Sequence, residues 1–467
     1  MRTKFARPNG SEQICASKLR HNQSMPLNQY WETEKERKTL QQTKRGGFFM
    51  VENVMKNKEY TKVEASLLAN SKKAILAMQH LIAMFGATVL VPILTGFNPS
   101  VGLFTAGIGT LIFHLCTKGK VPAFLGSSFA FIPLILTVKD MYNGDLAYAQ
   151  GGMVVAGLIY VIISLLIKKI GVERIQKVLS PQVVGPMIIV IGLNLIPTAF
   201  GMARENLLVA AVTLGVAILI NFKGKGFIKQ LAILIGVISG YLLSLKIGIV
   251  NVDVVKEASL IAVPEFRLPR FDIGAIVIIA PVVLAVFMEH LGDITTNGQV
   301  VGKNFIKDPG LNRTLLGDGL ATMVASFMGG PANTTYGENT GVLALTKNYD
   351  PSILRLTAVF AIILGLVSKV GAVLTSIPTA VMGGISLMLF SMISLIGVKT
   401  VRNSKVKLSI KNIIVMAAIL ILGLGSGIIE KKFGITIGIP VTETVKISGL
   451  SFAAIVGIVL NVVLNRK

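Results

Sequence analysis

Apolar runs of about 20 residues recur along this chain from residue 73 almost to its C-terminus, and no other feature restricts the fold as strongly. A helix of about 20 residues spans a hydrocarbon core of about 30 Å. Barrel strands would be about 10 residues long with alternating polarity, whereas residues 151–167 and 413–424 are apolar on every face. With 52% hydrophobic residues, the sequence predicts an all-α polytopic membrane protein.

The apolar runs predict fourteen transmembrane spans. They lie at residues 74–94, 101–117, 122–138, 149–168, 182–200, 206–222, 226–246, 274–293, 313–328, 332–346, 352–370, 378–397, 409–428 and 447–464. Fourteen spans divide into two sets of seven, and an odd number of spans per set turns the second set upside down. The sequence therefore predicts a 7+7 inverted repeat.

Three short sequence motifs recur at an offset of roughly 200 residues and support this repeat. Gln79-His80-Leu81 in span 1 recurs as Glu289-His290-Leu291 in span 8. Pro122-Ala123 at the start of span 3 recurs as Pro331-Ala332 at the start of span 10, and Lys169-Ile170-Gly171 recurs as Lys369-Val370-Gly371. All three fall in the same order in both halves.

The net charge of +23 reports membrane topology rather than nucleic-acid binding, because the basic residues gather in the tails and in alternate loops. The opposite loops are short and nearly uncharged, apart from residues 247–273. This pattern predicts a multi-pass protein of the cytoplasmic (inner) membrane, in contact with lipid, with both termini in the cytoplasm. The basic loop residues are Lys118/Lys120, Lys168/Lys169/Arg174/Lys177, Lys223/Lys225, Lys303/Lys307/Arg313, Lys347/Arg355 and Lys399/Arg402/Lys405/Lys407.

Residues 1–73 form a polar segment without the apolar core or cleavage site of a signal peptide, and we expect a disordered cytoplasmic tail. An alternative is that Arg45-Gly46-Gly47 is a translated ribosome-binding sequence and that Met50 is the true start. The transporter domain is predicted at residues 74–465. The two cysteines, Cys15 and Cys116, are too few and too differently placed for a disulfide framework or a metal cluster.

The sequences of spans 3 and 10 are not typical of uninterrupted transmembrane helices. Residues 122–131 and 329–341 combine a proline with small, β-branched and hydroxyl residues. This composition suits a short extended stretch followed by a half-helix, whose free N–H groups attract ligand oxygens in mid-membrane. For span 3 the alternative is that glycine and serine merely allow close helix packing.

Carboxylates inside apolar spans are the other candidate functional groups. Glu289 and Glu338 each cost at least ~2.5 kcal/mol at the centre of a span unless they face a polar cavity or a partner. Asp293 lies one helical turn after Glu289, so the two could share a proton and couple transport to proton movement. The alternatives are a structural pairing with His290 or hydroxyl groups for the glutamates, and a helix cap for Asp293. Asp318 is equally ambiguous.

No catalytic or metal site is expected, and no cofactor beyond a coupling proton. A membrane-embedded hydrolase could be built on Glu289-His290, but no second histidine at metal-ligand spacing and no nucleophile motif accompany them. His80 and His114 are lone histidines in apolar helices, where packing roles are commoner than ligand roles. We rank His80 higher because it belongs to the motif that recurs in spans 1 and 8.

At these motifs the chain resembles the nucleobase/ascorbate transporter family, most closely its bacterial uracil permease branch. The matching stretches are QHLIAMFGATVLVP (79–92), GKVPAFLGSSFAF (119–131), DPGL (308–311) and NTTYGENTG (333–341). The family signature, an acid or amide, then Asn, any residue, Gly, four residues, Thr and a base, is met from Glu338 through Lys347. The resemblance covers residues 74–465 and leaves the tail unmatched.

The resemblance implies a core domain of spans 1–4 and 8–11 that moves against a gate domain of spans 5–7 and 12–14, with a homodimer formed through the gate. It places the nucleobase between the half-helices of spans 3 and 10. Glu289 and Glu338 would accept from the ring N–H groups, the backbone amides of Phe129 and Gly337 would donate to the carbonyls, and Tyr336 would shape the slot. His80, Ser128, Asp318 and Asn339 are accessory positions.

For substrate, the resemblance implies uracil taken up with a proton, because purine and xanthine carriers of the family usually have glutamine where Glu338 stands. Asp293 and Asp318 replace a histidine and an asparagine of the best-known uracil permease, and acids there look more like xanthine carriers. A xanthine or purine permease is therefore the alternative. A sulfate or bicarbonate carrier would need a positively charged binding pocket, and the predicted slot contains carboxylates and no embedded arginine.

Overall fold

The computed structural model describes residues 58–171, 180–404, 406–407, 409–435, 437–440 and 446–465. The chain divides into two units, Met1–Lys72 and Lys73–Lys467, and of the first unit only the helical residues from Lys58 onward are described. Most of the predicted tail therefore lies outside the described residues, together with Cys15 and the alternative start at Met50.

The described part of the chain is mostly helical. Seven of its helices are long and apolar enough to cross a membrane, or eight if a pair bent by 75° counts as one span. The seven are α4 (Lys58–Thr95, apolar from Asn70), α5 (Pro99–Cys116), α7 (Ala147–Ile170), α9 (Pro181–Arg204), the continuous run α14 (Ile273–Ile279), η3 (Ala280–Val282) and α15 (Val283–Val301), α20 (Thr379–Asn403) and α21 (Ile410–Phe433). The bent pair is α18 (Pro351–Leu366) and α19 (Ser368–Thr375).

The remaining elements are shorter. They are β1 (Leu125–Ser127), η2 (Phe129–Phe131), α6 (Ile132–Met141), α10 (Leu207–Lys223), α11 (Phe227–Gln230), α12 (Ala232–Lys246), α13 (Asp253–Glu257), η4 (Ile306–Gly310), α16 (Leu311–Phe327), β2 (Asn333–Thr335), α17 (Gly337–Thr346), β3 (Gly438–Pro440), β4 (Lys446–Ser448) and α22 (Gly449–Leu464). Each predicted span contains a helix, but several of these helices are short or broken. Fourteen crossings is therefore more than helix length and composition establish.

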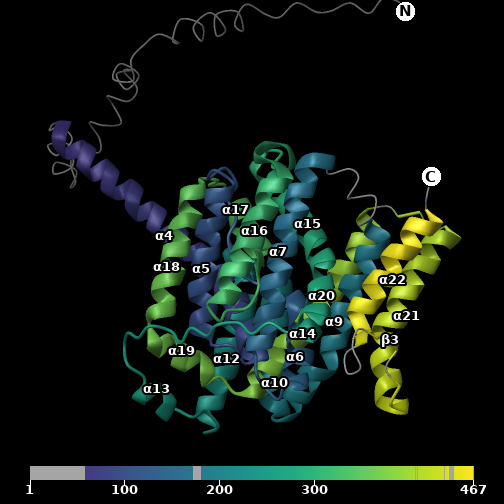
Figure 1. Ribbon diagram of the computed structural model, residues 1–467. Helices are drawn as coiled ribbons and strands as arrows, with labels where there is room; N and C mark the ends of the chain where they lie inside the picture. Colours follow the sequence, from purple (N-terminus) through teal and green to yellow (C-terminus); the bar gives the residue numbers. More distant parts are fainter. Residues whose placement is uncertain are drawn as a thin grey trace, which may run out of the picture. The chain divides into compact units, whose positions relative to one another are not determined.

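Helix packing falls into two groups. Figure 1 shows α5 and α18 of the first group on its left and α21 and α22 of the second on its right. In the first, α5 packs against α16 and α18, and α16 also packs against α7. In the second, α9 packs against α20 and α21, α10 packs against α12 and α20, and α21 packs against α22. The first group contains strands β1 and β2, so it is the group that carries the candidate site.

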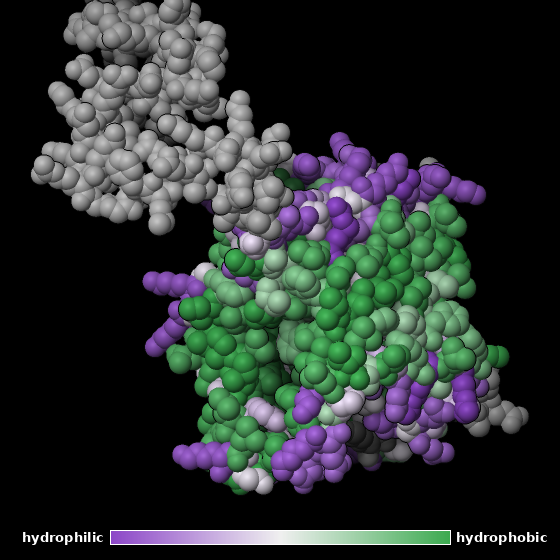
Figure 2. All heavy atoms as spheres, turned by 90° about the vertical axis from the view of Figure 1, so that its left-hand side faces the viewer, coloured by the Kyte–Doolittle hydropathy of each residue, from purple (hydrophilic) through white to green (hydrophobic). Residues whose placement is uncertain are grey.

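The surface is that of a membrane protein. Large apolar side chains are exposed on many helices, for example Leu242 on α12 and Ile421 on α21. Figure 2 shows one face on which hydrophobic side chains form a broad band with hydrophilic side chains above and below it. A contiguous apolar surface of this kind would be unstable in water, and a lipid environment removes that cost.

Candidate functional site

The short strands β1 and β2 of the first helix group pair with each other. β1 and β2 are antiparallel, with Gly126 opposite Thr334. The pairing continues at both ends, where Ser128 N donates to Ala332 O (2.8 Å) and Tyr336 N donates to Phe124 O (2.9 Å). Extended backbone inside a membrane protein needs such partners, because no water is at hand to satisfy it. The extended stretches predicted in spans 3 and 10 are thus both present.

A threonine from a neighbouring helix fastens each strand. Leu125 N donates to Thr110 Oγ1 of α5 at 2.9 Å. In the same way Asn333 N donates to Thr322 Oγ1 of α16 at 3.2 Å, and the Thr322 hydroxyl donates to Asn333 O at 2.9 Å. Neither threonine stands out in the sequence, because threonine in an apolar helix usually bonds only to its own helix.

A helical segment begins directly after each strand. η2 starts at Phe129 and continues into α6, and α17 starts at Gly337. In neither helical segment does the side chain of the preceding residue, Ser128 or Tyr336, cap the first N–H groups. Phe129 is half-buried and Gly337 is exposed. The backbone donors of both residues therefore remain open to a ligand with carbonyl oxygens.

Tyr336 connects the two strands through its side chain. Its hydroxyl donates to Ser127 O at 2.8 Å, and its ring lies over Gly126, where an added Cβ would be 2.4 Å from Tyr336 Cζ. The tyrosine is only 5% exposed, so it forms a wall of this region. Ser128, at the end of β1, is buried, and its hydroxyl has no partner among the described residues.

The three predicted acids come together beside the start of α17. Glu289 on α15 is exposed, while Asp293 one turn later and Glu338 in the first turn of α17 are half-buried. An added Cβ at Gly337 would lie 3.7 Å from Asp293 Oδ1, so α15 faces the end of α17 that carries the free donors. α15 packs against α17, so Glu289 and Glu338 lie on neighbouring helices. The arrangement offers carboxylate acceptors beside backbone donors.

The exposed residues of α15 continue from Glu289 along one face of the helix. Gly292, Thr296 and Gln299 follow at helical spacing, and all are exposed. A face of this polarity does not border lipid at low cost, so it borders water or another polar surface.

Asp318 lies behind the site rather than in it. Its carboxylate forms an ion pair with His290 Nδ1 at 2.8 Å, and both side chains are buried. His290 Nε2 also lies 2.9 Å from Thr314 Oγ1. His290 therefore partners Asp318, and not its neighbour Glu289, because consecutive helical residues point about 100° apart.

The other two histidines that the sequence singled out lie near the strands and form hydrogen bonds there. Asn339 Nδ2 lies 3.1 Å from both His80 Nδ1 and His80 O, which ties α4 to α17. His114 Nε2 lies 3.1 Å from Ala123 O, just before β1. Asn297 on α15 was missed by sequence reasoning. It donates to Pro122 O at 2.8 Å and to Thr340 Oγ1 at 3.2 Å.

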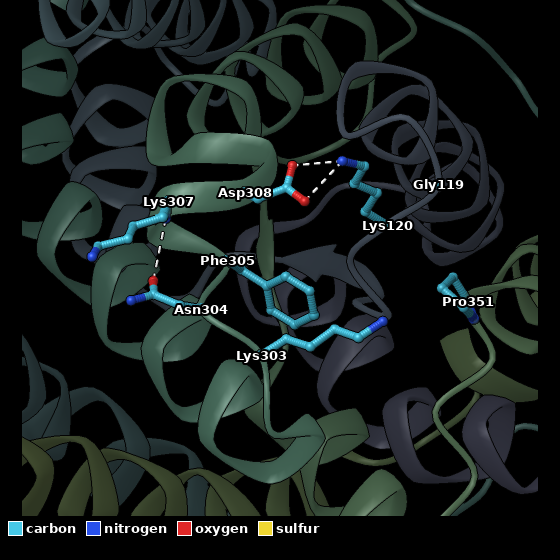
Figure 3. Close-up of a pocket in the computed structure, with 8 residues that line it drawn as sticks. All are labelled: Gly119, Lys120, Lys303, Asn304, Phe305, Lys307, Asp308 and Pro351. Carbon is cyan, nitrogen blue, oxygen red and sulfur yellow. Dashed lines mark hydrogen bonds and ion pairs between the residues drawn. The ribbon is translucent and has the colours of Figure 1, made fainter.

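A separate cavity of about 630 Å³ lies elsewhere, among loops that the sequence places in the cytoplasm. Figure 3 shows Lys120 reaching Asp308 there, with Nζ–Oδ1 and Nζ–Oδ2 distances of 2.6 and 2.8 Å. None of the candidate site residues lines this cavity. Among the residues that the structure describes, no group of three or more His, Cys, Asp or Glu side chains is placed to hold a metal ion.

Known proteins resemble this chain over most of its length. A sequence model described as a permease family matches residues 71–431. The uracil permease of Bacillus subtilis (strain 168) is 42% identical over 410 residues, which cover 84% of this chain and 92% of that protein. The uracil permease of Escherichia coli (strain K12) is 38% identical over 401 residues, covering 83% and 90%.

Among solved structures, murine solute carrier 26 family member A9, an anion transporter in the inward-facing state, matches with a TM-score of 0.64. That match covers 100% of this chain and 76% of the other chain, at 10% sequence identity. At so low an identity the likeness concerns the fold alone.

Proposed function

The chain belongs to the permease family of the nucleobase/ascorbate transporters, and we propose that it takes up uracil across the cytoplasmic membrane together with a proton. It is a transport protein rather than an enzyme. The observation that carries the proposal is that carboxylates of α15 and α17 lie beside the start of α17, where an added Cβ at Gly337 would be 3.7 Å from Asp293 Oδ1.

Uracil is complementary to this set of groups. It has two ring N–H donors and two carbonyl acceptors on a flat ring. In our proposal Glu289 and Glu338 accept from the N–H groups, and the amides of Phe129 and Gly337 donate to the carbonyls. The buried ring of Tyr336 forms a wall of the slot. The proton is carried by Glu289, together with Asp293 one turn away.

A xanthine or purine permease is the second candidate, because acids stand at Asp293 and Asp318. The pairing of Asp318 with His290 weakens this argument, since it turns that acid away from the slot. Glu338, in the first turn of α17, bears more directly on the substrate. Competition between the two bases separates the candidates. Excess unlabelled uracil should abolish uptake of a labelled purine if both bases bind in one slot, and should barely change it otherwise.

We further propose fourteen spans in two inverted sevens. Helix packing supports this, because contacts recur when the two halves are exchanged. The packing of α5 on α18 corresponds to that of α16 on α7, and α10 on α12 corresponds to α21 on α22. Likewise α9 on α21 corresponds to α20 on α10. The two strands and their fastening threonines, Thr110 and Thr322, correspond in the same way.

The two packing groups suggest which helices form each domain of the transporter. We propose that α4–α7 and α14–α19 form the moving core, and that α9–α12 and α20–α22 form the gate through which two copies associate. Both termini would lie in the cytoplasm, on the side of the lysine-rich loops. The apolar residues exposed on α21, such as Ile413 and Ile421, would then face lipid or the second copy.

The test is uptake of radiolabelled uracil by cells that lack their own carrier. Wild type is compared with Glu289→Gln and Glu338→Gln, with and without a protonophore. Glu265→Gln is the matched control, because that carboxylate is 81% exposed in a loop. We expect a loss of about tenfold or more for both site variants and none for the control.

A collapse of wild-type uptake with the protonophore supports coupling to protons. Uptake that persists at full rate with the protonophore would contradict that part of the proposal. If wild type took up xanthine but not uracil, the substrate would be wrong while the site remained in place.

A further inference from the structure

His290 connects the interior of the core with the candidate site. It directly follows Glu289 in the sequence, but its side chain points into the protein, between α15, α16 and β2. Its ring meets three groups there: Asp318 at 2.8 Å, Thr314 Oγ1 at 2.9 Å and Thr335 Oγ1 at 3.5 Å. The first two belong to α16, and Thr335 is the last residue of β2.

The ion pair of His290 and Asp318 is completely enclosed. The two side chains are 0% and 1% exposed, and they meet without the alignment of a hydrogen bond. Neither carboxylate oxygen of Asp318 has a hydrogen-bond donor among the described residues. A carboxylate buried in this way needs a counter-charge, and His290 is the group that can supply it.

The hydrogen-bond pattern also favours a charged ring. The Thr314 hydroxyl donates to Leu311 O at 3.0 Å, so its oxygen accepts and Nε2 of His290 donates. We infer that Nδ1, which lies 2.8 Å from Asp318 Oδ2, carries the second proton, because the buried carboxylate needs a counter-charge. A histidine with both nitrogens protonated is a cation with no free lone pair.

The positive charge on His290 determines the direction of the Thr335 hydroxyl proton. Thr335 Oγ1 lies 3.5 Å from His290 Nδ1 and 3.3 Å from Asp293 Oδ2. Because a protonated Nδ1 cannot accept a hydrogen bond, the single hydroxyl proton of Thr335 goes to Asp293. The contacts form one chain from Asp318 through His290 and Thr335 to the acid beside the start of α17.

We propose that His290 is a positioning residue of the transport site. Paired with Asp318, it fixes the direction of the Thr335 hydroxyl, which in turn holds Asp293 against the start of α17. His290 and Thr335 touch no substrate in this proposal. The inference rests on the proposed function for its transport readout, and its stability readout is independent of any substrate.

The first measurement is a double-mutant cycle in thermal unfolding of the purified protein in detergent. His290→Gln and Asp318→Asn each leave one buried charge without a partner, whereas the double variant leaves none. We therefore expect the double variant to unfold at a higher Tm than at least one single variant. Tm losses that simply add up would overturn the ion pair, whatever the substrate is.

The second measurement is the KM and Vmax of uracil uptake, normalised to the amount of protein in the membrane. Thr335→Val keeps the shape of the side chain and removes its hydroxyl. We expect Vmax to fall about tenfold with Tm unchanged, and Thr335→Ser to restore it. Thr213→Val is the matched control, because the Thr213 hydroxyl donates only to Val209 O of its own helix.

The combined variant Thr335→Val/Asp318→Asn tests whether the two residues act in one chain. We expect little further loss of Vmax beyond the larger single effect. Wild-type Vmax in Thr335→Val, or losses that multiply fully in the combined variant, would overturn the positioning role. A wild type that binds no uracil would instead contradict the proposed function, and the Tm cycle would still decide the ion pair.

Discussion

The hydroxyl of Tyr336 donates a hydrogen bond of 2.8 Å to the carbonyl oxygen of Ser127. The two residues belong to opposite halves of the chain: Ser127 ends β1, and Tyr336 directly follows β2. This bond adds a side-chain link to the backbone pairing of the strands. The region around Gly126 is therefore held from both strands.

Tyr336→Phe should weaken this strand pairing without removing it. The ring would still pack over Gly126, but the Ser127 carbonyl would lose a buried donor, at a cost of about 1 kcal/mol. We expect a small decrease in Tm of the purified protein and a rise of a few-fold in the KM of uracil uptake. An unchanged Tm together with an unchanged KM would contradict the importance of this bond.

Gly126→Ala should be far more damaging than its size suggests. The new Cβ would lie 2.4 Å from Tyr336 Cζ and 2.8 Å from Thr88 Oγ1, and a ring fixed by a strand cannot move aside. We expect loss of uracil uptake or of folded protein in the membrane. Gly215→Ala in α10 is the control, since a Cβ there meets nothing within 4 Å. Equal behaviour of the two variants would contradict the close contact.

The polar face of α15 should be open to water-soluble reagents. In a chain with Cys15→Ser and Cys116→Ser, we expect Thr296→Cys and Gln299→Cys to react with a membrane-impermeant thiol reagent. Ile294→Cys, at a position that is 1% exposed, should react about tenfold more slowly. Reaction in inside-out vesicles supports a cytoplasmic opening, and reaction only in right-side-out vesicles would contradict the proposed orientation.

The ion pair of Lys120 and Asp308 should contribute little, although it is short. The side chains are 46% and 70% exposed, so water screens the charges. Asp308→Asn should change the free energy of unfolding by less than about 1 kcal/mol, in contrast to Asp318→Asn. Thermal unfolding of both variants side by side checks this, and a larger loss for Asp308→Asn would show a role beyond a surface pair.

Low pH should destabilise the N-terminal turn of α14. Asp272 accepts from the Tyr142 hydroxyl and from the N–H groups of Gly274 and Ala275, and these bonds lower the pKa of Asp272. A lowered folded-state pKa means that the stabilisation is present at neutral pH and is lost as pH falls through that pKa. Below about pH 4 we expect wild type to lose more Tm than Asp272→Asn. Identical acid profiles for the two proteins would contradict this cap.

The sequence was sufficient for the features that follow from local composition or from the cost of burying charge. Small, β-branched and hydroxyl residues that follow Pro122 and Pro331 predict the extended stretches. The cost of a carboxylate in lipid singles out Glu289 and Glu338, which lie on the neighbouring helices α15 and α17. Both inferences need only a few neighbouring residues.

The features that sequence reasoning missed depend on contacts between distant segments. His290 was considered as a partner of Glu289, and only the packing of α15 against α16 shows that it faces Asp318. Thr110 and Thr322 look like ordinary helix residues until β1 and β2 are placed beside them. A single sequence does not specify which side of a helix meets which neighbour.

The pairing of β1 with β2 also has a consequence for biosynthesis. When Leu125–Ser127 has entered the membrane, its partner Asn333–Thr335 has not yet been translated. Until then the N–H and C=O groups of the first strand lack their final partners, in a medium where each such group is costly. The first half of the chain must therefore adopt a temporary arrangement until the second half is inserted. In that arrangement, neighbouring helices or the insertion machinery shield the unpaired backbone groups of the first strand. A truncated product that ends before residue 333 should accordingly be a substrate for membrane quality control.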